Sequence, residues 1–276
     1  MTSTLSDYSK LCVHTFTTKP WNLKQCVEYY SRAGIQAITI WRNVLENIEL
    51  KDAKAILDDY GMITVSIARG GFFPSTEEKL RLEAIDDNKL AIDQAAAVGA
   101  PSLVLVCGAD GRQSLETSRD QIKEAIIKLL PHAKASGVKL AIEPLHPMYA
   151  GDRSAINTLA QANDMAEEIN SDYVGIAVDV YHLWWDPNLE QEIKRCGRNG
   201  NLLAFHVCDW NVPTIDFLND RGLMGDGCIN IPRIRGWVED AGFTGFNEVE
   251  VFSTKYWATD QKDYLELIKN AYLKYT

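Results

Sequence analysis

VGIAVDV, residues 174–180, is an apolar run of strand length that places an acidic side chain next to its end. Continuous apolar runs of this kind are typical of strands buried on both faces of a parallel sheet. Similar runs recur along the chain, and helical spacing of apolar residues follows each of them. The other predicted strands are LCVHTF (11–16), AITIW (37–41), MITVSIA (62–68), SLVLVC (102–107), KLAIEPL (139–145), LLAFHV (202–207) and FNEVEVF (246–252).

Eight strand–helix units without a break in composition predict an α/β fold, a single (β/α)₈ TIM barrel that spans residues 1–276. A doubly wound open sheet is the alternative, but no GxGxxG follows the first strand. The Gly-Gly pair after Arg69 is expected to end the third strand. Ser75, with Glu78 three residues later, predicts a capping box at the start of the next helix, and Pro131 predicts a kink in the helix after that.

Composition narrows the classes of protein that fit. The chain is 46% apolar and 24% charged, which is typical of a globular protein with a sizeable core. The formal net charge of −10 disfavours binding to nucleic acid or to anionic membranes. The first ten residues, MTSTLSDYSK, lack the pattern of a secretory signal. The six cysteines form no CxxC pair, so we expect reduced thiols in a cytoplasmic protein.

Four potential metal ligands follow one another at the ends of the last four predicted strands. They are Glu143, Asp179, His206 and Glu250. A parallel barrel gathers the carboxyl ends of its strands at one rim, where catalytic sites lie. Carboxylates with one imidazole suit Mn²⁺, Mg²⁺ or Co²⁺, with zinc as an alternative. We expect one divalent metal ion, with Mn²⁺ as the first choice.

A single acid at a strand end is more often a capping or salt-bridged residue than a metal ligand. The histidines favour the metal site, because four of the five lie at or near predicted strand ends: His14, His146, His182 and His206. Glu248 competes with Glu250 for the fourth position, since strand periodicity puts both on one side. Glu250 is preferred because it lies nearer the rim.

Further residues near the predicted rim are candidates for catalysis or substrate binding. His146 has the ordinary pKa of a general acid or base near neutrality, and Glu143 and Glu250 are the other catalytic candidates. The substrate-binding candidates are His14, Arg69, His182, Trp184, Trp210 and Arg221. Each has an alternative structural role: a hydrogen-bonded scaffold histidine, a ring that closes the barrel top, or a solvated arginine in an ion pair. No Gly-rich or basic phosphate cradle is evident, which favours a substrate without a phosphate group.

The chain resembles the xylose isomerase-like barrel superfamily, the sugar phosphate isomerase/epimerase group, over nearly its whole length. The resemblance is carried by IEP (142–144), VDVYH (178–182), FHVCDW (205–210), GDG (225–227) and VEVF (249–252). It implies one divalent metal held by Glu143, Asp179, His206 and Glu250, and proton transfer next to a sugar carbonyl. Related nucleases with three zinc ions use histidines where this chain has Arg69 and Cys107. The net charge also speaks against that activity.

A second branch is equally similar: the large subunits of C-glycoside deglycosidases, which act on 3-oxo-glucosides by β-elimination beside a small β-sandwich subunit. EPLHPMYAGD (143–152), with His146 as the base, fits this branch as well as it fits an epimerase.

We therefore expect a metal-dependent enzyme that removes a proton next to the carbonyl of a keto sugar or polyol derivative. Isomerisation or epimerisation is the first expectation, and a lyase is the alternative. The expected partners are a small sugar substrate and an oligomer, with a small subunit if the lyase branch applies. A hypothesis from another class is a non-catalytic subunit that uses exposed rim aromatics as an interface. These are Trp184, Trp185, Trp210 and Trp257.

Overall fold

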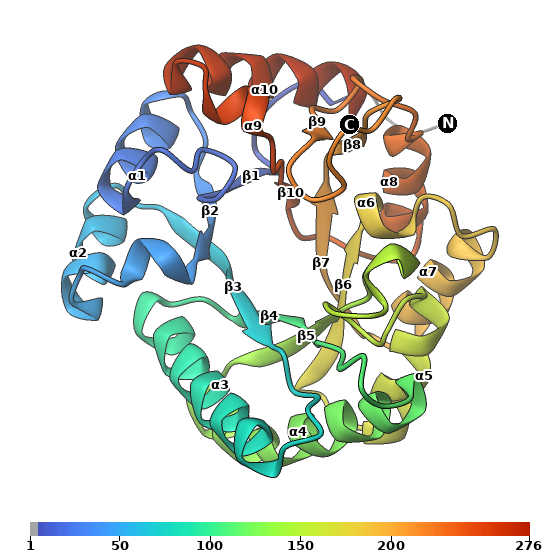
Figure 1. The fold of residues 1–276 in the computed structure, drawn as a ribbon. Helices are drawn as coiled ribbons and strands as arrows, with labels where there is room; N and C mark the ends of the chain where they lie inside the picture. The colour runs from blue at the N-terminus through green and yellow to red at the C-terminus, as the bar shows by residue number, and fades with distance from the viewer. Residues whose placement is uncertain (1–4) are drawn as a thin grey trace.

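Every predicted apolar run forms a barrel strand in the computed structural model, which describes residues 5–276. The strands pair in parallel around a closed barrel of eight, and the last closes on the first, which confirms the predicted (β/α)₈ architecture (Figure 1). In barrel order they are β1 (Leu11–His14), β2 (Ala37–Trp41), β3 (Ile63–Gly71), β4 (Ser102–Val106), β5 (Lys139–Glu143), β6 (Val174–Asp179), β7 (Leu202–Val207) and β10 (Asn247–Val249).

Helices surround the strands as an outer ring (Figure 1). The longer ones are α1 (Leu23–Arg32), α2 (Leu50–Asp59), α3 (Glu78–Val98), α4 (Leu115–Ser136), α5 (Leu159–Ile169), α7 (Leu189–Arg198), α8 (Ile231–Asp240) and α10 (Gln261–Tyr275). The short ones are α6 (Val180–Leu183), α9 (Thr254–Trp257) and the 3₁₀ turns η1 (Arg42–Leu45) and η2 (Pro147–Tyr149). The capping box predicted at Ser75 is wrong, because α3 begins three residues later and Ser75 Oγ accepts from the backbone N of Glu77 at 3.1 Å.

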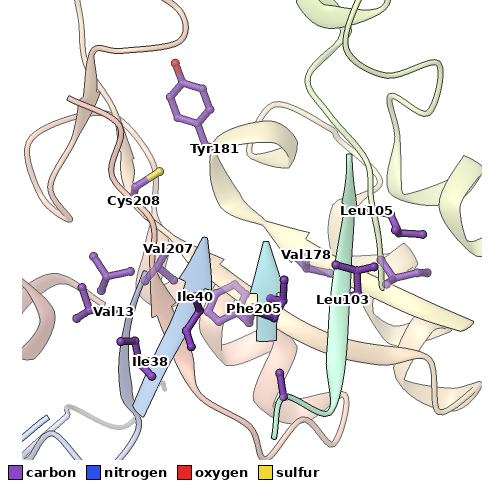
Figure 2. Close-up of a cluster of buried hydrophobic side chains, with 14 of the residues drawn as sticks. Val13, Ile38, Ile40, Leu103, Leu105, Val178, Tyr181, Phe205, Val207 and Cys208 are labelled. Atoms are coloured by element: carbon purple, nitrogen blue, oxygen red, sulfur yellow. The ribbon is translucent and has the colours of Figure 1, made fainter. Parts of the chain in front are cut away.

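Alternation along the strands separates two apolar layers. Leu103 and Leu105 belong to the large cluster that includes the apolar faces of the helices, and Figure 2 shows part of it. Val104 between them belongs to a small cluster with Ala141, Ala177 and Ala204 from the next three strands. Because a side chain two positions further along a strand points to the same face, the residues two positions after these alanines also face the interior.

The Gly-Gly pair does not end β3, contrary to the sequence-based expectation. β3 continues through Gly70 and Gly71, which pair with Leu105 and Val106 of β4. A Cβ on Gly71 would lie 1.9 Å from the carbonyl oxygen of Val106, and its φ is +104°. Asn88 from α3 bonds both sides of the Gly71 peptide, since its Oδ1 accepts from Gly71 N at 2.7 Å and its Nδ2 donates to Gly71 O at 2.9 Å. The glycines therefore allow a close approach of two strands.

The segment after β7 contains a short antiparallel pair, β8 (Asp209–Trp210) and β9 (Arg221–Gly222), where the sequence predicts only a loop. Asp209 is buried and its carboxylate accepts from the backbone N of Gly225 and of Ile229, both at 2.9 Å. Three backbone donors, with Trp210 N at 2.8 Å, thus hold the GDG turn in place.

The six cysteines are all unpaired, as predicted, and Cys12, Cys107 and Cys208 are buried. Among residues 5–276, no helix combines the length and the apolar character needed to span a membrane.

Replacing Gly71 with Ala is expected to lower the free energy of unfolding by at least about 2 kcal/mol, because it adds a backbone clash to an unfavourable φ. Gly34 has a φ of +79° but no atom near its missing Cβ, so Gly34→Ala is the matched control and should cost about 1 kcal/mol. Urea unfolding monitored by circular dichroism measures both variants. Equal losses would contradict the close-approach explanation.

Candidate metal centre and substrate pocket

Glu143, Asp179, His206 and Glu250 converge at the mouth of the barrel. Each offers one ligand atom that lies within 4.8 Å of the others. Glu143 and Asp179 are the last residues of β5 and β6, His206 lies in β7, and Glu250 directly follows β10. All four are buried, with exposed fractions of at most 4%. The structure thus brings together the four side chains that the sequence singles out as metal ligands.

These residues fit a divalent cation. Glu143 Oε1 and His206 Nδ1 lie 2.9 Å apart, yet neither atom has a hydrogen bond of acceptable geometry to any described residue. Buried polar atoms without a partner are rare, and each calls for an explanation such as an ion or water. Three carboxylates and one imidazole are a donor set that Mn²⁺, Mg²⁺, Co²⁺ or Zn²⁺ can accept. The buried atoms without hydrogen-bond partners and the chemistry of the four side chains therefore both fit a divalent cation.

Arg221 supplies positive charge beside two of these carboxylates. Its Nη1 donates to Asp179 Oδ2 at 3.2 Å and to Glu250 Oε2 at 2.9 Å, and the residue is only 3% exposed. Burial raises the pKa of Asp179 to about 7, since Arg221 only partly offsets the cost of desolvation. Burial alone would lower the pKa of His206, but Glu143 and the neighbouring acids outweigh it and raise this pKa to about 10. Burial and the charges of neighbouring groups therefore act together on the ionisation of the cluster.

A second layer of polar residues lies deeper in the barrel than the four candidate metal ligands. Glu248 is fully buried and its Oε2 accepts from Thr39 Oγ1 at 2.5 Å and Ser66 Oγ at 3.3 Å. His14 lies between the two glutamates of the last strand, with Nε2 3.3 Å from Glu248 Oε2 and Nδ1 3.0 Å from Glu250 Oε1. The expectation from strand periodicity that both glutamates point inward is confirmed.

His14, His206 and Glu248 form a second group whose ligand atoms lie within 4.8 Å of one another. His14 is a predicted substrate-binding residue, but it is fully buried and lies behind Glu250. His14 therefore contacts the Glu250 carboxylate and does not line the substrate pocket described next.

A pocket with a cavity volume of about 180 Å³ opens above the candidate metal centre. Glu143, Glu250 and the predicted substrate-binding residues His182, Arg221 and Arg69 line it. Its other lining residues are aromatic, apolar, polar or basic side chains from the strand ends and the segments that follow them: Phe16, Trp41, Val106, Leu145, Tyr149, Arg153, Leu218, Asn219 and Phe252.

Three other predicted site residues, His146, Trp184 and Trp210, do not line this pocket. The ring centroid of His146 lies 5.1 Å from that of Trp210 and 5.6 Å from that of Trp185. Its Nδ1 accepts from the backbone N of Met148 at 3.2 Å. His146 is therefore part of an aromatic cluster beside the pocket.

The four tryptophans proposed as an exposed interface are each half-buried, so the prediction of their exposure is wrong. Trp184 packs on Trp210 at a centroid distance of 5.6 Å, and Trp257 meets Phe16 at 5.5 Å. Mutual packing of the rings explains their burial. The exposed apolar side chains of this rim are Val212, Ile215 and Phe217.

Several residues of the pocket region carry no signal in the sequence. Tyr149 and Tyr181 both donate their hydroxyl to the backbone oxygen of Phe217, at 2.6 and 2.7 Å. These bonds fix the loop that brings Leu218 and Asn219 to the pocket. Arg153 lies in a loop with no periodic pattern, so only the fold reveals that it lines the same pocket.

Comparison with known proteins gives consistent matches over nearly the whole chain. A family model described as xylose isomerase-like TIM barrel matches residues 27–271. Inosose isomerase from Halalkalibacterium halodurans is 23% identical over 274 residues, which cover 95% of this chain and 94% of that protein. Inosose isomerase from Bacillus velezensis is 25% identical over 271 residues, which cover 94% of each.

Two crystal structures extend the comparison. A protein from Sinorhizobium meliloti is 43% identical, with a TM-score of 0.93 and coverage of 96% of this chain and 98% of that one. The IolI protein with a bound zinc atom is 22% identical, with a TM-score of 0.84 and coverage of 96% of each chain. At that identity the likeness to IolI concerns the fold.

Single replacements His206→Ala and Asp179→Ala are expected to reduce bound Mn²⁺ below about a tenth of the wild-type stoichiometry, because each removes one of few protein ligands. Metal content after Mn²⁺ loading and desalting, measured by mass spectrometry, tests this. His132→Ala is the matched control, because His132 lies on α4 and pairs with Asp93 outside the pocket. Full occupancy in both site variants would exclude this centre.

Proposed function

The chain belongs to the xylose isomerase-like TIM barrel family, and we infer that it is a divalent-metal-dependent isomerase or epimerase of a keto sugar or a polyol-derived ketone. Similarity to inosose isomerases along nearly the whole length supports this class of reaction. Aromatic and polar side chains line the pocket together, which suits a small sugar.

The observation that carries the proposal is the placement of two carboxylates in one pocket. Glu143 and Glu250 both line it, and β6 and β7 lie between their strands around the barrel. His206 Nδ1 is 2.9 Å from Glu143 Oε1 and 4.0 Å from Glu250 Oε2, so both acids approach the same imidazole. A substrate in the pocket would meet both side chains. The glutamate that is ionised removes the proton next to the carbonyl and becomes protonated. The other glutamate, protonated at the start, gives its proton to the neighbouring carbon or the opposite face, so the two exchange protonation states.

Glu250 is held in its ionised, deprotonated form. Burial would raise its pKa, but His14, Arg221 and His206 together hold this pKa well below its usual range. Glu250 is therefore ionised at neutral pH. When bound, a divalent cation would supply Lewis-acid stabilisation of the negative charge that develops on the enediolate oxygens.

The aromatic side of the pocket orients the sugar and excludes water. Phe16, Trp41 and Phe252 pack on one another with ring centroids 4.6 to 5.2 Å apart. Aromatic rings bind the apolar C–H faces of sugars and leave the hydroxyls for polar partners. His182, buried at the pocket wall with its pKa lowered well below the usual value by burial, stays neutral and can bond a hydroxyl.

Mn²⁺ is the proposed metal, since it accepts a set of carboxylates with one imidazole. The unpaired cysteines support a reducing, cytoplasmic setting. For the alternative lyase activity His146 is the expected base, and the position of this residue outside the pocket gives that alternative no support.

Replacing Glu143 or Glu250 with Gln is expected to slow exchange of solvent deuterium into an inosose by at least about a hundredfold, because general acid–base catalysis contributes about 10² to 10⁴. NMR of the Mn²⁺-loaded enzyme in deuterated water measures the exchange, and metal content is determined in parallel. Glu116→Gln, on the exposed surface of α4, is the matched control. Failure of the wild type to exchange with any keto sugar would reject the proposal. Unchanged exchange in both variants would reject the roles of the two glutamates.

His146→Ala is expected to retain exchange within about threefold of the wild type, since its ring lies in the aromatic cluster beside the pocket. The same NMR assay measures it. A loss as large as that in Glu143→Gln would restore His146 as the base.

A further inference from the structure

We propose that the substrate carries an anionic group, a carboxylate or a phosphate, which Arg69 and Arg153 bind at the side of the pocket. This inference rests on the proposed function, because it specifies the chemical class of the keto sugar. It starts from three arginines that line one pocket of a chain with a net charge of −10. Arg221, the third, is already engaged by Asp179 and Glu250.

Arg69 is a half-buried guanidinium that lacks an acidic partner. Its Cζ lies 4.1 Å from the ring centroid of Phe72, and no carboxylate of residues 5–276 lies within 4.0 Å of its nitrogens. The acid whose charge acts on it is Asp87, but both Asp87 oxygens accept from Arg42 at 2.7 Å. Partly buried arginines are normally paired with an anion. The side chain therefore has unused capacity to bind one.

Arg153 adds a second guanidinium that is weakly paired. Its Nε lies 3.9 Å from Asp152 Oδ2, a carboxylate that is itself 70% exposed. Its Cζ lies 5.7 Å from the ring centroid of Tyr149. Burial lowers the pKa of Arg69, and the positive charge of Arg153 lowers it further. An oxyanion between them would relieve this repulsion and accept hydrogen bonds from two planar donors.

The backbone segments that carry the two arginines are held together by close contacts at Gly108. Gly108 N donates to Arg153 O at 2.8 Å, and Gly108 O accepts from Ala155 N at 2.9 Å. A Cβ on Gly108 would lie 2.7 Å from the Cα of Phe72, in the segment that follows Arg69. Positions fixed in this way reduce the ordering cost of binding.

The pocket then has two chemically distinct sides. Glu143 and Glu250 border the candidate metal centre. On the other side, Arg69 has no carboxylate within 4.0 Å among residues 5–276 and Arg153 pairs only weakly with Asp152, so both provide positive charge. The keto end of the substrate would face the glutamates and the anionic group would face the arginines. The sequence favours a non-phosphorylated sugar because its basic residues form no contiguous cradle; only the fold makes this pair of arginines neighbours.

Calorimetric titration of the Mn²⁺-loaded full chain with a hexitol, its 6-phosphate and the corresponding hexonate tests the inference. None of the three has a ketone or an aldehyde group, so binding is measured without turnover. We expect at least one anion to bind tenfold or more tightly than the hexitol. Arg69→Gln and Arg153→Gln should each lower the affinity for that anion by about tenfold to a hundredfold. Preference for the 6-phosphate or for the hexonate identifies which anion the site takes.

Arg112→Gln is the matched control, because Arg112 is exposed, pairs with Asp110 and Glu77, and lies outside the pocket. Arg69→Lys should retain part of the preference. The inference is overturned if neither anion binds more tightly than the hexitol, if none of the three binds, or if both Gln variants weaken the hexitol and the anions equally. Circular dichroism checks that each variant is folded. Absence of deuterium exchange in the wild type would reject the proposed function, but the measured preference for an anion would still stand.

Discussion

The four carboxylates buried at the mouth of the barrel can stay close together only because positive charge around His206 compensates their repulsion. Four carboxylates are buried there, each at most 4% exposed: Glu143, Asp179, Glu248 and Glu250. Like charges brought together away from water repel strongly. Arg221 and the imidazoles of His14 and His206 supply the compensating charge within the described chain. A divalent cation would add to that compensation, so its binding would also stabilise the folded state.

The barrel interior provides the space for this cluster. On three neighbouring strands an alanine lies two residues before a polar residue of the centre: Ala141 before Glu143, Ala177 before Asp179 and Ala204 before His206. Because alternate side chains share a face, the alanines form the layer below. Small side chains in that layer leave room for the longer acids and the imidazole to converge. The same alternation turns Phe205 and Val207 toward the large core (Figure 2).

Much of this arrangement follows from local patterns in the sequence. Apolar runs of strand length predict the strands, and the residue types at the strand ends single out the four candidate metal ligands that the structure brings together. Contacts between loops are different, since no periodicity relates Arg153 to Arg69 or directs His146 toward Trp210. The continuation of β3 through Gly71 is equally a tertiary effect, because it depends on the approach of Val106.

Anomalous diffraction from a crystal grown with Mn²⁺ would locate the metal ion in the barrel. We expect one peak bounded by Glu143, Asp179, His206 and Glu250, with ligand atoms at about 2.0 to 2.4 Å. A peak at the deeper group of His14, His206 and Glu248, or no peak at the mouth of the barrel, would contradict this expectation.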